Sequence, residues 1–291
     1  MCMVLAVVDL ARAGALRENR IYFESPVLLE RYYANFEAVA KPRQHPNPFM
    51  PFYHLTGKLE GGMPSFWHLQ LKPGCELKKP RKNKDIHDMV EWAYLDDELF
   101  AILQDDTQRE LLAQDMAQHW FKRDLADLKG VVFQSQQISN YEKVIRGLTL
   151  DVRGVRDVPV SIRNPAFRRV VTEQYGYRCA ATRLKVLLPD GRAMVQAAHI
   201  HPVSEGANDD PRNGLALTPD MHWAMDNYLI APGPDLNWHV SKVIEAKDTS
   251  DYVWLNSLRG RPLWLPENPL FRPKLEALEW RLAAMKNHSF N

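Results

Sequence analysis

The stretch AAHIHPVSEGANDDPRNGLALTPDMHWAMD, from Ala197 to Asp226, constrains the fold of this chain more than any other. Small apolar residues lead to His199, which we predict to end a β-strand. A loop rich in turn-forming residues follows, and a Thr-Pro pair predicts the beginning of a helix at Pro219, because proline fits the first helical position. In that helix His222 and Asp226 lie four residues apart, and therefore on one face. The sequence thus predicts a strand, a loop and a helix, with a histidine on both the strand and the helix.

The residues before this stretch predict a hairpin and a further helix. CAATRLKVLLPDGRAMVQAAHI contains two β-like runs around a Pro-Asp-Gly turn signal. Upstream, NPAFRRVVTEQYG is typical of a helix in which Asn164 is the cap, Pro165 the first residue and Gly176 the stop. We therefore expect a β-hairpin packed on a helix in the second half of the chain.

A histidine at a strand end beside a second histidine on a helix suits the hydrolysis of a phosphodiester. The reaction needs a deprotonated water in line with the leaving oxygen, and a neutral histidine such as His199 serves as general base near neutral pH. A divalent metal offsets the negative charge of the departing oxygen, and His222 with Asp226 can hold that metal from one helix face. Asn213 can accept a hydrogen bond from the other ring nitrogen of His199 and so fix its tautomer.

The pattern A-A-H-I-x-P, then N-G-L-x-L, then H-x-x-x-D, resembles the HNH endonucleases of the ββα-metal (His-Me finger) class, in the version found in bacterial restriction enzymes. The resemblance covers roughly residues 164 to 229. It implies that His199 is the general base, that Asn213 orients this base or tightens the loop, and that His222 holds a divalent metal ion. Mg²⁺ or Mn²⁺ is the expected ion, with Zn²⁺ or another transition metal as alternatives.

Two positions depart from the pattern of that class. Many HNH enzymes carry an acidic or histidine ligand immediately before the base, where this chain has Ala198, so the metal depends on Asp226, Asn213 or water. Others hold a structural zinc ion with cysteine pairs, whereas Cys179 has no partner in a C-x-x-C pair. The alternatives are therefore a catalytically dead finger in a DNA-binding protein, or three polar residues with only a structural role.

Length and composition favour two domains. The chain has 291 residues, 45% of them hydrophobic, and a formal net charge of +1, so it can build ordinary cores, and binding of nucleic acid depends on local basic patches. Its three cysteines are isolated, which disfavours a disulfide framework and favours a cytoplasmic protein. The apolar N-terminal run is interrupted by Asp9 and is far shorter than the ~20 residues of a membrane span. We predict that this run is a core helix and that the protein has no membrane contact.

The first half of the chain is predicted to be mainly helical. ESPVLLERYYANFEAVA, from Glu24 to Ala40, has helical spacing, and the prolines that follow argue against helix and central strand. FYHL and FWHLQL predict a small hairpin, and DDELFAILQDD and TQRELLAQDMAQHWF two amphipathic helices. Weak periodicity between Phe121 and Ser161 predicts a linker, so we place the boundary near Asp151. The expected α+β protein has a DNA-reading domain over residues 1–150 and an HNH nuclease domain over residues 151–291.

The proline-rich segment HPNPFMPFYHL and the FWHLQL run resemble the sulfur-binding domain that precedes HNH modules in type IV, modification-dependent restriction endonucleases. The resemblance implies recognition of phosphorothioate DNA, because an apolar pocket accepts sulfur at a smaller desolvation cost than oxygen. A proline-rich structural loop is the alternative for this segment, and a solvated loop is the alternative for the basic run KKPRKNK. The residues expected to contact DNA are Arg20, Arg43, His45, Pro48, Pro51, Phe52, Tyr53, Lys79 and Arg81.

These observations together predict a type IV restriction endonuclease that binds double-stranded, phosphorothioate-modified DNA and hydrolyses it with a divalent metal. The rival enzyme is an HNH nuclease that reads another modification or a sequence. A methylcytosine reader more often uses a β-rich, base-flipping pocket, which the helical first half disfavours. Assembly as a homodimer is left open by the sequence.

Overall fold

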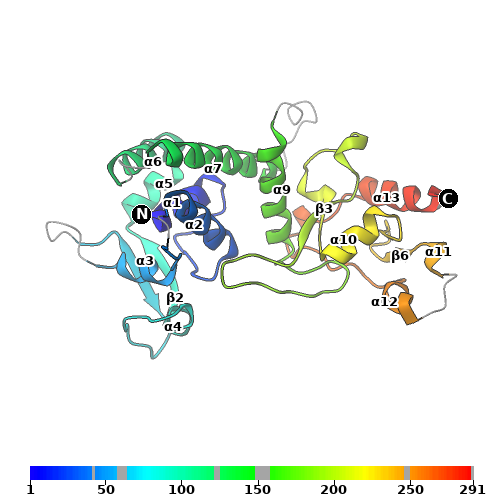
Figure 1. Ribbon diagram of the computed structural model, residues 1–291, viewed down its shortest axis with the longest axis horizontal. Helices are drawn as coiled ribbons and strands as arrows, with labels where there is room; N and C mark the ends of the chain where they lie inside the picture. The colour runs from blue at the N-terminus through cyan, green and yellow to red at the C-terminus, as the bar shows by residue number, and fades with distance from the viewer. Residues whose placement is uncertain (41–42, 58–63, 121–124, 148–157, 246–249, 290–291) are drawn as a thin grey trace. The chain divides into compact units, whose positions relative to one another are not determined.

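The computed structural model describes residues 1–40, 43–57, 64–120, 125–147, 158–245 and 250–289. The chain divides into two compact units, Met1–Lys143 with Leu188–Arg192, and Val144–Leu187 with Ala193–Asn291. Both units combine helices with two-stranded sheets, so the predicted α+β class is confirmed (Figure 1). The position chosen for the boundary, Asp151, lies outside the described residues. No helix in the described part of the chain is both long and apolar enough to cross a membrane.

Helices make up most of the first unit. Its elements in chain order are α1 (Cys2–Arg12), α2 (Pro26–Val39), α3 (Phe49–His54), β1 (Trp67–Leu71), α4 (Asn83–Met89), β2 (Val90–Leu95), α5 (Asp97–Gln104), α6 (Asp106–Trp120) and α7 (Leu125–Arg146). The N-terminal run forms the predicted core helix, since every residue of α1 from Met3 to Arg12 is buried. α2 packs against α1 and begins at the predicted Pro26, and α5 and α6 match the two predicted amphipathic helices.

The predicted hairpin between FYHL and FWHLQL is wrong. The first of these runs lies largely in α3, and β1 pairs instead with β2, with Trp67 opposite Leu95. Pro51 is accommodated as the third residue of α3, because the amides of the first helical turn have no acceptor within the helix. The true partner strand comes after α4, beyond the reach of a local pattern.

The predicted linker between Phe121 and Ser161 is also wrong over much of its length, because α7 occupies Leu125–Arg146. Ile138, Tyr141 and Ile145 are buried at the spacing of one helix face. The charges that weakened the pattern include Glu142, which lies in the core. It accepts hydrogen bonds of 2.7 Å at both carboxylate oxygens from the buried Arg31, and a charge can be buried when it is paired in this way.

The second unit contains the strand and helix on which the sequence analysis centred. Its elements are α9 (Val160–Gln174), β3 (Gln196–His199), the 3₁₀ turns η2 (Val203–Glu205) and η3 (Pro211–Asn213), β4 (Gly214–Leu217), α10 (Pro219–Asp226), β5 (Ile230–Pro232), β6 (Trp238–Val240), α11 (Lys242–Glu245), η4 (Ser250–Tyr252), α12 (Val253–Asn256), η5 (Pro269–Phe271) and α13 (Leu275–Asn287). α9 begins at Val160, so Asn164 does not cap it and Pro165 lies inside it. It ends where predicted, just before Gly176, whose φ of 59° is readily adopted by glycine.

The hairpin of this unit has a different second strand from the one expected. β3 ends at His199 as predicted, but it pairs with β4, the G-L-A-L run after Asn213, and not with the run before the Pro-Asp-Gly turn. That earlier run forms the isolated bridge Leu187–Ala193. α10 begins at Pro219 as predicted and packs on both strands, while α9 also packs on β3 and β4 (Figure 1). β3, β4 and α10 therefore form a ββα unit, and α9 precedes this unit in the chain.

Candidate active site

His199 is fixed in place by Asp209, which is itself held by Arg163, and by Phe167. Its Nε2 lies 3.0 Å from Oδ1 of Asp209, a carboxylate that is only 1% exposed. The other oxygen of Asp209 accepts a hydrogen bond of 2.7 Å from Nε of Arg163 on α9. Phe167, one turn further along α9, stacks on the imidazole with ring centroids 4.0 Å apart and planes within 2° of parallel. The ring therefore has one defined orientation at the end of β3.

Asn213 braces the loop between the two strands. Its Oδ1 accepts the backbone N–H of His201 at 2.9 Å, and its Nδ2 donates to the backbone oxygens of His201 at 2.9 Å and Asn208 at 3.1 Å. The buried Asn213 therefore tightens the loop, the second of the two roles expected for it. The ring of His199 is oriented by Asp209 instead, so the predicted hydrogen bond between Asn213 and His199 is wrong.

His222 and Asp226 lie on the same face of α10, as their spacing requires. Nε2 of His222 is 3.3 Å from Oδ2 of Asp226, and its Nδ1 is 3.1 Å from Oε1 of Gln196 on β3. Burial lowers the pKa of His222 against the opposing effect of the Asp226 charge, and His199 and Arg281 lower it further. A lowered pKa favours the neutral imidazole, which is the form that binds metals.

Arg281 of α13 ties the C-terminal helix to the strand that carries His199. It is 1% exposed, and it donates to the backbone oxygens of Ile200 at 2.5 Å and His199 at 3.0 Å. Burial lowers the pKa of this guanidinium. Sequence reasoning missed this residue, because nothing in the local pattern of α13 links it to β3.

Asp209 and Arg163 were missed as well. Asp209 stands in the N-D-D-P-R-N turn, where an aspartate is commonly interpreted as a turn residue, and its neighbour Asp210 does serve in that way by accepting from the backbone N–H of Arg212. A pair of adjacent aspartates just before Asn213 is a signal that one of them has a second task. Only the folded chain shows that Asp209 faces His199.

The structure offers few candidate metal ligands at this site. Ala198, where many HNH enzymes have a ligand, is fully buried in the core. Within the described residues, no group of three or more His, Cys, Asp or Glu side chains is arranged to hold a metal ion. The pair formed by His222 and Asp226 supplies one imidazole nitrogen and one carboxylate oxygen from adjacent turns of α10.

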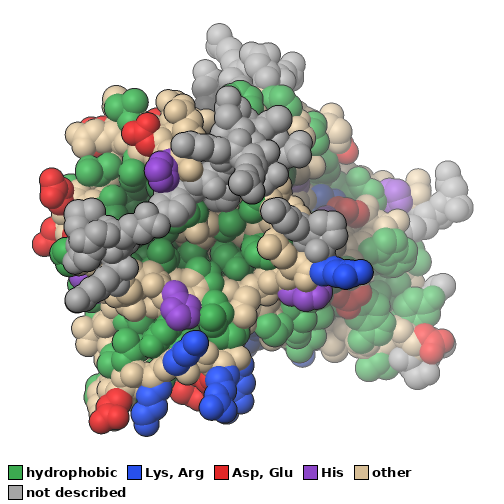
Figure 2. All heavy atoms as spheres, turned by 60° about the vertical axis from the view of Figure 1, so that its left-hand side comes forward, with side chains coloured by type: hydrophobic (Ala, Val, Ile, Leu, Met, Phe, Trp, Pro, Cys, Tyr) green, Lys and Arg blue, Asp and Glu red, His purple; other side chains and the backbone are tan. Residues whose placement is uncertain are grey.

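The residues predicted to contact DNA from the first unit have different environments. Arg43, His45, Lys79 and Arg81 are exposed, Pro51 and Tyr53 are partly exposed, Arg20 is exposed and packs over the ring of Trp92, and Pro48 and Phe52 are buried. Figure 2 shows Lys and Arg side chains gathered along the lower edge of one face, with acidic side chains among them.

Phe52 is a core residue, contrary to its predicted contact with DNA. It is 0% exposed, and its ring packs edge to face on Phe23 at 5.0 Å and Trp67 at 5.3 Å between centroids. Its backbone oxygen also accepts a hydrogen bond from the indole N–H of Trp67. Pro48 is likewise buried, so neither residue presents a surface to DNA in this structure.

Comparison with known proteins identifies the family of the ββα segment. Residues 179–231 match the family model described as HNH endonuclease, a range that contains His199, Asn213 and His222. No curated protein matches the chain. Among solved structures, one described as "Modification dependent TagI restriction endonuclease" is similar, with 22% identity and a TM-score of 0.35. The similar region covers 45% of this chain and 40% of the restriction endonuclease, so it spans less than half of the length of that protein.

Proposed function

We propose that this HNH endonuclease domain hydrolyses DNA phosphodiesters with His199 as the general base. The observation that carries the proposal is the 3.0 Å contact between His199 Nε2 and the buried carboxylate of Asp209. Asp209 accepts a hydrogen bond from Arg163 through one oxygen, and its other oxygen is an acceptor as well. Nε2 of His199 is therefore the donor in its contact with Asp209, and it carries the ring proton. Nδ1 then keeps its lone pair, and within the described residues it makes no hydrogen bond. It is therefore the atom that takes a proton from water.

The surroundings of His199 suit this role because they hold the ring without blocking it. Phe167 covers one face of the imidazole, and the side chain as a whole is 24% exposed. A base held in one orientation needs no rearrangement when the phosphodiester and the water arrive, which is the benefit of positioning in catalysis. The contacts made by Asn213 and Arg281 fix the backbone of the base itself and of the two residues that follow it.

The donor set fits a divalent ion that is shared with the DNA. His222 Nε2 and Asp226 Oδ2 are 3.3 Å apart and partly exposed, so both can bind one ion while its other ligands come from water and phosphate oxygens. When bound there, the ion would offset the negative charge that develops on the phosphate and the departing oxygen. Gln196, which contacts Nδ1 of His222, would hold the imidazole with Nε2 directed at the ion.

The nuclease is tested by nicking of supercoiled plasmid with Mg²⁺ or Mn²⁺. His199→Ala should lower the nicking rate by about two to four orders of magnitude, the usual worth of a general base, while DNA binding measured by fluorescence anisotropy stays nearly unchanged. His239→Ala is the matched control, because His239 also pairs with a carboxylate, Asp235 at 2.9 Å, in the same unit. A wild-type chain that shows no metal-dependent nicking would make this a DNA-binding protein with an inactive finger.

We further propose that the first unit directs cleavage to modified DNA, with phosphorothioate as the modification. The support is the resemblance of its proline-rich segment to sulfur-binding domains, together with the environment of that segment. Arg43 and His45 are exposed, and Pro51 is partly exposed in the first turn of α3, so a guanidinium, an imidazole and an apolar ring are all accessible in this segment. Arginine can hold the phosphate charge while proline offers no N–H to reward an oxygen.

The choice of modification is tested by titrating the full chain with phosphorothioate duplexes of each phosphate diastereomer and with the unmodified duplex at fixed salt. The wild type should prefer one phosphorothioate diastereomer by about 1–3 kcal/mol, by analogy with a single methylene in an apolar site. Pro51→Ala should reduce this preference. Arg43→Ala should weaken binding to all three duplexes. Pro73→Ala, at an exposed turn after β1, is the matched control. Equal affinity of the wild type for all three duplexes would exclude sulfur recognition and leave the nuclease proposal intact.

A further inference from the structure

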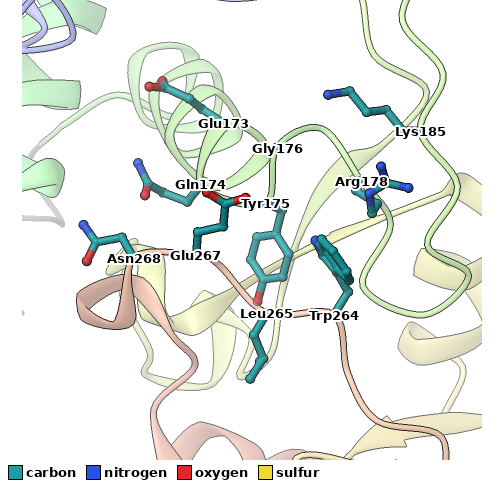
Figure 3. A pocket seen from close by; sticks show the side chains of 10 residues that line it. All are labelled: Glu173, Gln174, Tyr175, Gly176, Arg178, Lys185, Trp264, Leu265, Glu267 and Asn268. Atoms are coloured by element: carbon teal, nitrogen blue, oxygen red, sulfur yellow. The ribbon is translucent and has the colours of Figure 1, made fainter.

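The second unit contains a cavity of about 600 Å³ whose lining includes none of His199, His222 or Asp226. It lies between the end of α9 with the turn that follows, and the extended segment before η5 (Figure 3). Its volume falls in the range of about 300–1,000 Å³ typical of small-molecule sites. The side chains that give it chemical character are Gln174, Arg178, Lys185, Trp264, Glu267 and Asn268.

One end of the cavity is cationic and aromatic. Arg178 lies over the indole of Trp264, with its Cζ 5.2 Å from the ring centroid, and Arg183 approaches the same ring at 5.9 Å. Nη1 of Arg178 also donates to the backbone oxygen of Arg183 at 2.7 Å. In the described part of the chain, neither arginine nor Lys185 has a carboxylate partner. Cations without a carboxylate partner beside a partly exposed aromatic ring attract an anionic ligand that also has a flat face.

The other end of the cavity has hydrogen-bonding groups of the kind that contact base edges. Figure 3 shows Gln174, Glu267 and Asn268 on the opposite side of Tyr175 from Arg178, Lys185 and Trp264. The carboxylate of Glu267 repels a phosphate and accepts from an amino group, so it favours one direction of binding. Glu173 is already engaged by Arg146, at 2.5 Å.

The walls of the cavity are tied to the strands that hold the proposed base. Tyr175 is buried, and its hydroxyl donates to the backbone oxygen of Gly214 at 3.3 Å. Gly214 is the residue opposite His199 in the β3–β4 register. The backbone N–H of Trp264 donates to the oxygen of Ala180 at 2.9 Å. The cavity is therefore a preformed part of the nuclease unit.

We infer that this cavity binds one nucleotide of a DNA strand, with a phosphate against Arg178 and Lys185 and the base against Trp264. The inference rests on the proposed nuclease function, because it takes DNA as the ligand. Proteins that hold unpaired strands combine cations for the backbone with aromatic rings on which bases stack, and both are present here. A base can reach the cavity only when it is unpaired. The second unit should therefore bind single-stranded DNA more tightly than its net charge alone predicts.

The test uses the full chain with His199→Ala, without metal, so that no cleavage occurs. Fluorescence anisotropy with a labelled single strand and with the matching duplex should show that Trp264→Ala lowers single-strand affinity by at least about fivefold, the lower end of base stacking. Lys185→Ala should lower single-strand affinity and reduce its salt dependence by about one phosphate contact. Trp264→Phe should restore most of the affinity, and Trp254→Ala, at an exposed tryptophan outside the cavity, should have no effect.

Unchanged single-strand affinity in both Trp264→Ala and Lys185→Ala overturns the inference. Lys185 is exposed, so its variant should fold even if Trp264→Ala does not. The outcomes are separable from those of the nuclease proposal, because this assay measures binding alone. A chain that nicks plasmid but binds single strands without using Trp264 or Lys185 refutes the nucleotide cavity, and a chain that never nicks but needs both residues refutes the nuclease.

Discussion

Replacing Asp209 with asparagine should slow DNA cleavage nearly as much as removing the base itself. Nε of Arg163 lies 2.7 Å from one oxygen of Asp209, so an asparagine would turn its carbonyl oxygen toward the guanidinium and its amino group toward His199. The amino group is a donor, and Nε2 of His199 would have to become an acceptor. The ring proton would then move to Nδ1, the atom that must accept the proton of water.

The expected size of the effect follows from that exchange of tautomers. A general base contributes about 10²–10⁴ in rate, and a ring held in the wrong tautomer forfeits most of it. The change lies in the turnover step, because Asp209 is 1% exposed and does not reach the DNA. We therefore expect Asp209→Asn to lower kcat by about 10²–10⁴ and to leave KM for plasmid within about twofold.

The assay is plasmid nicking at saturating Mn²⁺, with kcat and KM determined separately. Asp210→Asn is the matched control, because it removes the same charge from the next residue, which pairs with Arg212 at 2.7 Å and Lys274 at 2.8 Å instead of His199. The control should keep its kcat. If Asp209→Asn cleaves within about threefold of the wild type while His199→Ala is about a hundredfold slower, Asp209 does not set the tautomer of the base.

Other perturbations test the surroundings of the site. Burial alone would raise the pKa of Asp210, but hydrogen bonds from two basic side chains outweigh it and hold that pKa below its usual range. A lowered pKa gives stability that is present above the unfolded-state value, about 4, and is lost as the pH falls through the folded value. Asp210→Asn should therefore lower the thermal unfolding midpoint at neutral pH, and the deficit should shrink below about pH 4; a constant deficit would contradict this. His222→Ala should lose activity that partly returns at high metal concentration, as a Mn²⁺ titration of nicking would show. Arg281→Met should leave buried carbonyl groups without a donor, at about 1–3 kcal/mol for each, measured by urea unfolding. Phe52→Ala should cost about 3–5 kcal/mol in the same measurement, and a negligible loss would mean that the ring is not part of the core.

The central pattern of the second unit could be predicted because its rules are local. His199 ends a strand and Pro219 begins a helix, since a Thr-Pro pair and the change from strand to helix spacing act within a few residues. The i and i+4 spacing likewise places His222 and Asp226 on one face of α10 whatever the helix packs against. The sequence by itself therefore determined where β3 ends, where α10 begins and which positions on them carry the candidate base and metal ligands.

The contacts between distant residues were decided by the tertiary structure alone. Asp209 meets His199 and Arg163 because the loop after β3 folds back against α9, and a sequence of turn residues carries no record of which way that loop faces. The pairing of β1 with β2 and the burial of Phe52 similarly depend on which apolar faces meet when the core forms. Burial of apolar surface has no direction of its own, so a local pattern shows that a residue is apolar but not whether it lines a pocket or fills a core.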